Sequence, residues 1–232
     1  MSAASNPLPE TPGAHRSRAA SLALRPAITA AALFIWFETQ HLIGARALPA
    51  GGAGAGIGDQ LHAWTAGANH YFYQHQGAAN ILLIASSGVI DLLGIFLLGK
   101  WIFGRSVRPF AGLLIVLGLR QIMQALVALP APQGAIWHYP GFPSLLVTYG
   151  VANDFFFSGH TSIAVLGATE LARPGKRWLT SLAVLIAVFE IATVIILRAH
   201  YTMDVFTGAV AALYAAYLAG RIAAPIDRRL GS

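Results

Sequence analysis

The chain has 232 residues, of which 56% are hydrophobic and only 10% are charged, and its mean hydropathy is +0.62. Soluble domains carry about 25% charged residues, so part of this surface must be covered by a lipid bilayer. The net charge of +6 follows the topological pattern described below, and we do not interpret it as nucleic-acid binding. The absence of cysteine excludes a disulfide framework and a thiolate nucleophile.

Apolar runs of about 20 residues predict membrane-spanning helices. The sequence contains six such runs, near 27–47, 79–99, 109–130, 155–172, 177–199 and 202–222. We therefore expect an all-α, six-helix polytopic integral membrane protein with one catalytic membrane domain over 25–224. Residues 1–24 are rich in Pro, Ala and Ser and predict a disordered cytoplasmic tail, and residues 225–232 predict a short C-terminal tail.

The basic residues predict the orientation. With six spans, twelve of the 15 lie on one side: Arg16, Arg18, Arg25, Lys100, Arg105, Arg108, Arg173, Lys176, Arg177, Arg221, Arg228 and Arg229. The positive-inside rule then places both termini in the cytoplasm. We expect a multi-pass protein of the inner (plasma) membrane, with the loops 48–78 and 131–154 on the exoplasmic or periplasmic side.

These two outer loops have different compositions. The first contains His62, His70 and His75, which raises a zinc hypothesis. Spacings of eight and five residues do not form a compact ligand set, so an amphipathic segment in the membrane interface is the favoured interpretation and no metal is predicted. The loop 131–154 is rich in Pro and Gly, and we expect it to cap a site that lipids reach from the bilayer.

Two short motifs carry the chemistry. His160 lies at the outer end of the fourth span and His200 at the outer start of the sixth, so both share one membrane face. Asp204 follows His200 by four residues, and the two share a face if the helix already includes residue 200. A carboxylate that binds one imidazole nitrogen leaves the other nitrogen nucleophilic. Gly159 permits close backbone approach, and either Ser158 or Thr161 is expected to cap the helix. We predict catalysis by His160, His200 and Asp204 over the alternative of two interfacial histidines.

The strings Ser-Gly-His-Thr at 158–161 and His-Tyr-Thr-Met-Asp at 200–204 resemble the signature motifs of the type 2 phosphatidic acid phosphatase superfamily, in its sphingomyelin synthase-like branch. Asp154 matches an aspartate of that branch, and Arg120 followed by Leu-Pro-Ala-Pro at 129–132 resembles another of its stretches. The plant phosphatidylcholine:diacylglycerol cholinephosphotransferases are similar over a longer reach, from about Arg108 to Gly220.

This resemblance implies a membrane phosphotransferase with a phospholipid donor, a lipid alcohol acceptor and no cofactor. It implies that His200 attacks phosphorus and forms a phosphohistidine, that Asp204 orients His200, and that His160 protonates the leaving diacylglycerol oxygen and then deprotonates the acceptor. The residues expected to contact the substrate are Arg120, Asp154, Ser158, Gly159, Tyr201 and Arg198. Headgroup, acceptor and oligomeric state are left open.

Two departures bear on the reaction type. The hydrolytic phosphatases of the superfamily carry extra cations, whereas Val194 occupies one expected arginine position and the stretch Lys100 to Arg108 is predicted at the cytoplasmic side. Fewer cations favour a phosphodiester over a phosphomonoester dianion. A lipid phosphate phosphatase is the alternative, and a non-catalytic transporter or lipid-binding protein is the second.

Arg120 lies near mid-depth of the third span, where a charge needs a partner. One interpretation is a structural ion pair with Asp91, and the other is contact with the substrate phosphate. The sequence leaves both open.

Overall fold

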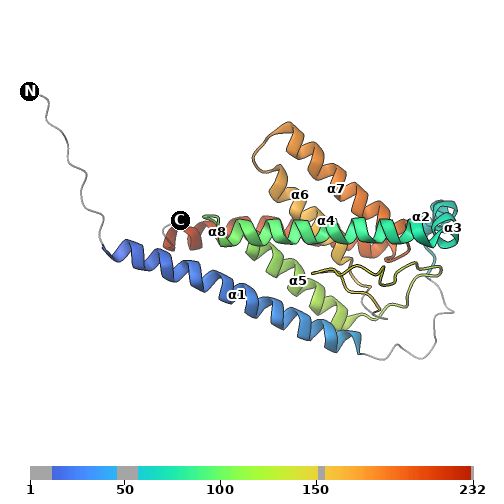
Figure 1. The fold of residues 1–232 in the computed structure, drawn as a ribbon, viewed down its shortest axis with the longest axis horizontal. Coiled ribbons are helices and arrows are strands. Elements are labelled where there is room, and N and C mark those ends of the chain that lie inside the picture. The colour runs from blue at the N-terminus through green and yellow to red at the C-terminus, as the bar shows by residue number, and fades with distance from the viewer. Residues whose placement is uncertain (1–11, 46–56, 151–154, 231–232) are drawn as a thin grey trace, which may run out of the picture.

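A computed structural model of the chain describes residues 12–45, 57–150 and 155–230 (Figure 1). All regular elements within these ranges are α-helices. They are α1 (Pro12–Gly44), α2 (Gln60–Trp64), α3 (Ala66–Gln74), α4 (Gln76–Ile102), α5 (Arg108–Leu126), α6 (Gly159–Ala172), α7 (Arg177–Ile196) and α8 (Thr202–Arg229). The all-α class predicted from the apolar runs is therefore confirmed for the described residues.

Four helices in the described part of the chain are long and apolar enough to cross a bilayer: α4, α5, α7 and α8. The six-span count stays a prediction, because α1 and α6 do not meet the same criterion. Helix α6 has 14 residues, which corresponds to about 21 Å, whereas the hydrocarbon core of a bilayer is about 30 Å thick.

The helix boundaries differ from the expected spans mainly at the chain ends. Helix α1 begins at Pro12, so residues 12–24, expected in a disordered tail, form its first turns, while residues 1–11 lie outside the described ranges. Helix α8 continues to Arg229 through Pro225, so most of the expected C-terminal tail is helical. Helix α5 starts with Pro109 near its first position, where a proline costs no hydrogen bond.

The core lies where α4, α5, α6 and α8 meet. Its buried members are Leu97, Leu113, Val116, Phe157, Leu166, Ala212, Ala215 and Ala216. Helix α8 contributes small residues to this core, which lets neighbouring backbones approach closely as in other membrane bundles. At Gly208 the approach is close, because an added Cβ would lie 2.8 Å from the main-chain oxygen of Ser158. This contact brings the start of α6 against α8.

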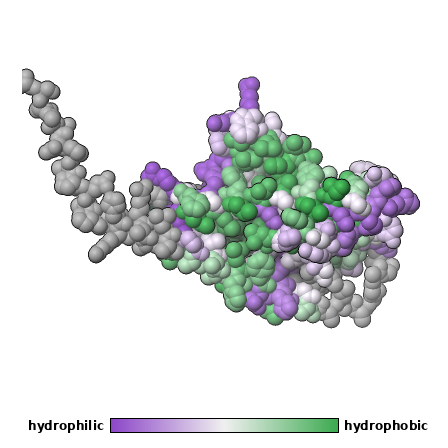
Figure 2. Space-filling model, in the orientation of Figure 1, coloured by the Kyte–Doolittle hydropathy of each residue, from purple (hydrophilic) through white to green (hydrophobic). Residues whose placement is uncertain are grey.

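The exterior is apolar, as a bilayer requires. Exposed large side chains lie on several of the long helices, among them Ile81, Leu92, Leu185 and Phe206. Figure 2 shows hydrophobic residues across the middle of the visible face and hydrophilic residues gathered toward its margins. The four apolar helices and this surface identify a membrane protein.

One end of the bundle collects charges. The carboxylate of Glu170, near the end of α6, pairs with Lys100 at 3.0 Å and with Arg108 at 3.1 Å. Nearby, Asp227 of α8 accepts hydrogen bonds from the Ser106 hydroxyl and the Val107 amide. The ends of α4, α6 and α8 and the start of α5 are therefore tied together at the end predicted to face the cytoplasm.

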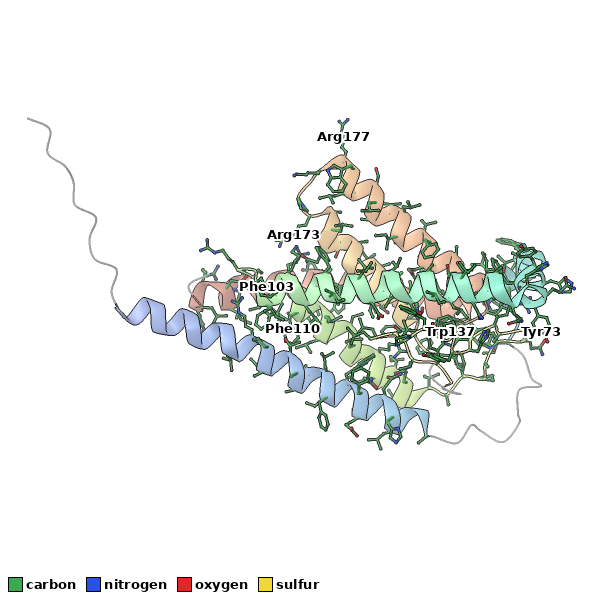
Figure 3. The ribbon with its side chains drawn as sticks, in the orientation of Figure 1. Tyr73, Phe103, Phe110, Trp137, Arg173 and Arg177 are labelled. Atoms are coloured by element: carbon green, nitrogen blue, oxygen red, sulfur yellow. The ribbon has the colours of Figure 1, made fainter. Side chains whose placement is uncertain are left out.

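The opposite end carries α2, α3 and the non-helical stretches 127–150 and 155–158. Figure 3 places Trp137 and Tyr73 toward this end and Phe103 toward the charged end of α4. The carboxylate of Asp91 in α4 anchors the stretch 127–150, because it accepts hydrogen bonds from the Ser144 hydroxyl and from the amides of Leu145 and Leu146. The two sequence motifs also lie at this end, at the starts of α6 and α8.

Candidate active site

Helices α6 and α8 begin side by side. Ser158, one of the two residues expected to cap the helix, caps α6 by accepting a hydrogen bond from the Thr161 amide at 3.2 Å. The amide of the same Ser158 donates to the Asp204 carbonyl oxygen at 3.1 Å, and the Ser162 hydroxyl donates to the Ser158 carbonyl. The bond from Ser158 to Asp204 joins the two motifs, which are distant in sequence.

A pocket lies at this junction and contains both histidines. It is lined by Trp36, Ile90, Leu117, Arg120, Trp137, Leu146, Val147, Thr148, Phe155, Gly159, His160, Ile163, Ala199 and His200. Four predicted site residues therefore share one concave surface: His160, His200, Arg120 and Gly159. Pockets of this kind, mostly apolar with a few convergent polar groups, are typical of ligand-binding sites.

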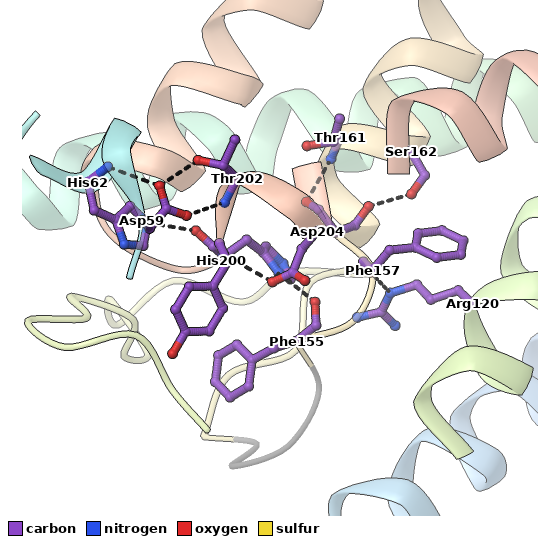
Figure 4. A network of polar contacts seen from close by, with 12 residues as sticks. Asp59, His62, Arg120, Phe155, Phe157, Thr161, Ser162, His200, Thr202 and Asp204 are labelled. Carbon is purple, nitrogen blue, oxygen red and sulfur yellow. Dashed lines mark hydrogen bonds and ion pairs between the residues drawn. The ribbon is translucent and has the colours of Figure 1, made fainter. Parts of the chain in front are cut away.

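The His200 ring is held by a main-chain carbonyl (Figure 4). Its Nδ1 lies 2.8 Å from the Phe155 oxygen and 3.7 Å from Oδ2 of Asp204. A carbonyl can only accept, so Nδ1 donates its proton and Nε2 has the free lone pair that a nucleophile needs. The carbonyl of Phe155, which sequence reasoning missed, thus fixes the tautomer.

Asp204 is fully buried, and its Oδ2 accepts a hydrogen bond from the Tyr201 amide at 3.0 Å. Its Oδ1 has no hydrogen-bond partner among the described residues. The carboxylate therefore lies within electrostatic reach of His200 but outside hydrogen-bond distance of its ring. This geometry suits stabilisation of a positive imidazolium better than control of its tautomer.

His160 occupies the second position of α6 and is buried. The Trp137 ring meets it edge to face, with 5.0 Å between centroids. Within the part of the chain that the structure describes, no group hydrogen-bonds to Nε2 of His160. Because His160 lines the pocket, this nitrogen is a candidate proton carrier for a bound molecule.

Arg120 is buried beside His160. Its Nε donates to the Phe157 oxygen at 3.0 Å, and it also contacts the side-chain oxygens of Gln40 and Gln124. Gly159 permits this arrangement, because a Cβ there would lie 3.1 Å from Nε of Arg120.

The proposed ion pair between Arg120 and Asp91 is not formed. Both residues are described, and the Asp91 carboxylate is bonded to Ser144, Leu145 and Leu146 instead. The interpretation in which Arg120 forms a structural ion pair with Asp91 is therefore wrong.

The other predicted substrate contacts lie elsewhere. The Arg198 guanidinium donates to the carbonyls of Gln133 and His62, and Tyr201 is buried and stacks on the His62 ring. Neither side chain is among those that line the pocket. Ser158 acts as the cap of α6, and Asp154 lies outside the described residues.

The three histidines of the first outer loop do not gather. His62 is buried against the His200 carbonyl, whereas His75 is exposed and bonded to Tyr71 and His70 is exposed. Sequence reasoning missed the role of this segment, although Asp59 before a short helical pattern was a recognisable cap signal.

The histidine pair and the buried arginine at one end of an apolar helical bundle define a membrane protein with a candidate acid–base and nucleophilic site. A family model described as AtPDCT1/2 matches residues 61–221, which is more than half of the chain. The chain belongs to this family. The match supports the resemblance to plant phosphatidylcholine:diacylglycerol cholinephosphotransferase and is consistent with the superfamily indicated by the motifs. Neither the curated proteins nor the solved structures include a significant match.

Proposed function

We propose that this protein is a membrane lipid phosphotransferase. It moves a phospho-alcohol headgroup, phosphocholine or phosphoethanolamine, from a glycerophospholipid to a lipid alcohol such as diacylglycerol or ceramide. The observation that carries this proposal is the meeting of His160, His200 and Arg120 in one pocket of a chain whose family implies a lipid transferase.

The first half-reaction forms a phosphohistidine. Nε2 of His200 attacks phosphorus, the bond from phosphorus to the diacylglycerol oxygen breaks, and protonated His160 gives its proton to that oxygen. The His200 ring becomes positively charged, because Nδ1 keeps the proton that it donates in the hydrogen bond to the Phe155 carbonyl. The Asp204 carboxylate, 3.7 Å from Nδ1, stabilises this positive charge. Arg120 contacts the phosphodiester anion from the neighbouring wall of the pocket.

The second half-reaction reverses these steps with a new alcohol. Neutral His160 takes the proton of the acceptor hydroxyl, its oxygen attacks phosphorus, and the bond from phosphorus to His200 breaks. Both lipids reach the site from the bilayer, while the stretch 127–150 and the apolar walls restrict water around the phosphohistidine. Transfer to a lipid alcohol therefore outpaces hydrolysis.

The aromatic lining bears on the headgroup. Trp36 and Trp137 line the same pocket as the histidines, and aromatic faces bind quaternary ammonium groups by cation–π attraction. This favours phosphocholine. Asp154 remains a proposed contact for the cationic headgroup. For Arg198 and Tyr201 we propose support of the His200 segment from behind, because their side chains are directed to Gln133 and His62.

Topology and location are part of the proposal. The pocket opens on the exoplasmic or periplasmic side, both termini lie in the cytoplasm, and the catalytic domain spans 25–224 six times in the inner (plasma) membrane. The charge cluster of Lys100, Arg108 and Glu170 at the other end of the bundle supports this orientation.

A lipid phosphate phosphatase is the second candidate, since the same two histidines serve both reactions in the superfamily. Lys100 and Arg108 are paired with Glu170, at the end of α6 opposite to His160. Ten residues of helix separate Glu170 from His160, or about 15 Å. The cations that a phosphomonoester dianion requires are thus not supplied by this cluster.

The test is a comparison of donors. Purified protein receives labelled phosphatidylcholine, phosphatidylethanolamine or phosphatidic acid, with and without diacylglycerol, and products are identified by mass. We expect headgroup exchange that depends on diacylglycerol, loss of exchange in His200→Ala, and unchanged exchange in His70→Ala, whose side chain is exposed. Rapid phosphate release from phosphatidic acid without exchange on phosphatidylcholine would establish the phosphatase instead. Neither exchange nor release would favour the non-catalytic alternative.

A further inference from the structure

The connection between α7 and α8, which carries His200, is held from its outer side by the short helix α2. Nε2 of His62 lies 2.9 Å from the carbonyl oxygen of His200, and both groups are buried. Since a carbonyl only accepts, Nε2 of His62 carries the proton and donates it. A side chain 138 residues away in sequence thus fixes the main chain of His200 itself.

The carboxylate of Asp59 holds the chain two residues after His200, at Thr202. Its Oδ2 accepts the Thr202 amide at 2.6 Å and its Oδ1 accepts the Thr202 hydroxyl at 2.6 Å. Oδ1 also accepts the amides of Leu61 and His62, which caps α2. One carboxylate therefore ties the helix that carries His62 to the first residue of α8 (Figure 4).

The chain turns sharply two residues before the first of these anchors. Arg198 has a φ of 52°, in the left-handed region, and its guanidinium donates to the carbonyls of Gln133 and His62. After this turn the His200 carbonyl is directed to α2, while the ring Nδ1 is directed to the Phe155 oxygen. The His200 ring is thus fixed at its own nitrogen, and the main chain that carries it is fixed at the His200 carbonyl and at Thr202.

We infer that Asp59 and His62 are positioning residues that hold the His200 ring for attack on phosphorus. This inference rests on the proposed function, in which His200 is the nucleophile. Neither residue lines the pocket, so both act through the backbone of the 197–202 segment. A displacement of about 1 Å at a reacting group lowers a rate by about 100-fold, which sets the expected effect.

The first test follows the burst of phosphohistidine on rapidly quenched protein. His62→Leu removes the donor, and His62→Gln keeps an N–H donor at a similar reach. His138→Leu is the matched control, because it removes a histidine whose Nε2 bonds to Asn80 away from the pocket. We expect a burst about 100-fold slower in His62→Leu, with full amplitude and an unchanged donor KM. His62→Gln restores most of the rate, and His138→Leu matches the wild type.

A reduced amplitude with an unchanged burst rate would show that His62 only supports folding, and would overturn the inference. Asp59→Asn gives a second measurement. Its remaining oxygen still caps α2, but its NH₂ group faces the Thr202 amide, so we expect the same slow burst. A wild-type rate in both His62→Leu and Asp59→Asn would also overturn the inference.

The second test needs no lipid. Diethyl pyrocarbonate modifies imidazole nitrogens, and peptide mass analysis gives the rate at His200 relative to His160. We expect this ratio to rise several-fold in His62→Leu and to stay at the wild-type value in His62→Gln and His138→Leu. An unchanged ratio in His62→Leu would refute positioning. If the wild type transfers no headgroup, the proposed function fails, and this ratio still decides whether His62 holds the His200 ring.

Discussion

Replacing Asp204 by asparagine tests how the buried carboxylate acts on His200. In the folded chain Nδ1 of His200 donates to the Phe155 carbonyl, and Oδ2 of Asp204 lies 3.7 Å away. The tautomer of His200 therefore survives the substitution. What is lost is the attraction between a carboxylate and the imidazolium that forms when Nε2 bonds to phosphorus.

The size of this loss follows from Coulomb's law. Two unit charges 3.7 Å apart attract by about 4 kcal/mol at an effective dielectric constant of about 20. Each 1.36 kcal/mol corresponds to about a factor of ten in rate, so Asp204→Asn lowers phosphohistidine formation by up to about 1,000-fold. The stability changes little, because the amide oxygen still accepts the hydrogen bond from Tyr201.

The assay is headgroup exchange with a phosphatidylcholine donor, together with thermal unfolding in detergent. Asp227→Asn is the matched control, since it makes the same change in the same helix, at the charged end of the bundle. We expect Asp227→Asn to keep wild-type exchange. Exchange in Asp204→Asn above about a tenth of wild type would refute the electrostatic role. A fall in Tm that accounts for the lost activity would show that Asp204 serves the fold alone.

Three further predictions concern packing, topology and acid stability. Gly208→Ala places a Cβ 2.8 Å from the main-chain oxygen of the α6 cap, so we expect the free energy of unfolding to fall by about 1–3 kcal/mol and headgroup exchange to be reduced. Gly118→Ala, whose Cβ would meet nothing within 4 Å, should change neither the free energy of unfolding nor the exchange. In intact cells an impermeant thiol reagent should label Phe142→Cys and not Phe103→Cys, since both positions are exposed and the chain has no native cysteine. Labelling of Phe103→Cys without labelling of Phe142→Cys would show that the proposed orientation is inverted. Burial by itself raises the pKa of Asp59, but hydrogen bonds from Thr202 and His62 outweigh it and lower that pKa from 3.8. Its contribution to stability is therefore complete above the ordinary pKa and is lost as the pH falls below about 4, so the Tm of Asp59→Asn should fall less on acidification than that of the wild type; parallel curves would contradict this.

Much of the fold was predictable because its signals are local in sequence. Apolar runs of bilayer length identified α4, α5, α7 and α8, since a helix satisfies its own backbone hydrogen bonds within one segment. Ser158 was one of two residues predicted to cap α6, and the shared end of the bundle for both histidine motifs followed from counting spans. The length of α1 was missed because residues 12–24 carry no apolar run.

The partners of the site residues were decided by tertiary structure. The sequence favoured Asp204 as the partner of His200 because the two lie four residues apart, yet the closest acceptor is the carbonyl of Phe155, 45 residues away. Every residue has such a carbonyl, so sequence cannot single one out. Likewise Arg120 reaches the carbonyl of Phe157 instead of the carboxylate of Asp91, because packing of α5 against the start of α6 directs it there.

The sequence by itself therefore determined a helical membrane protein and the end of the bundle where the two histidine motifs lie. Only the tertiary structure decided that Asp59 and His62 hold the segment of His200, across 143 and 138 residues of chain. The physical reason is the distance in sequence over which each kind of interaction acts. Hydropathy and helix caps depend on neighbours within a few residues, whereas a buried hydrogen bond depends on which distant backbone groups the packed helices bring within about 3 Å.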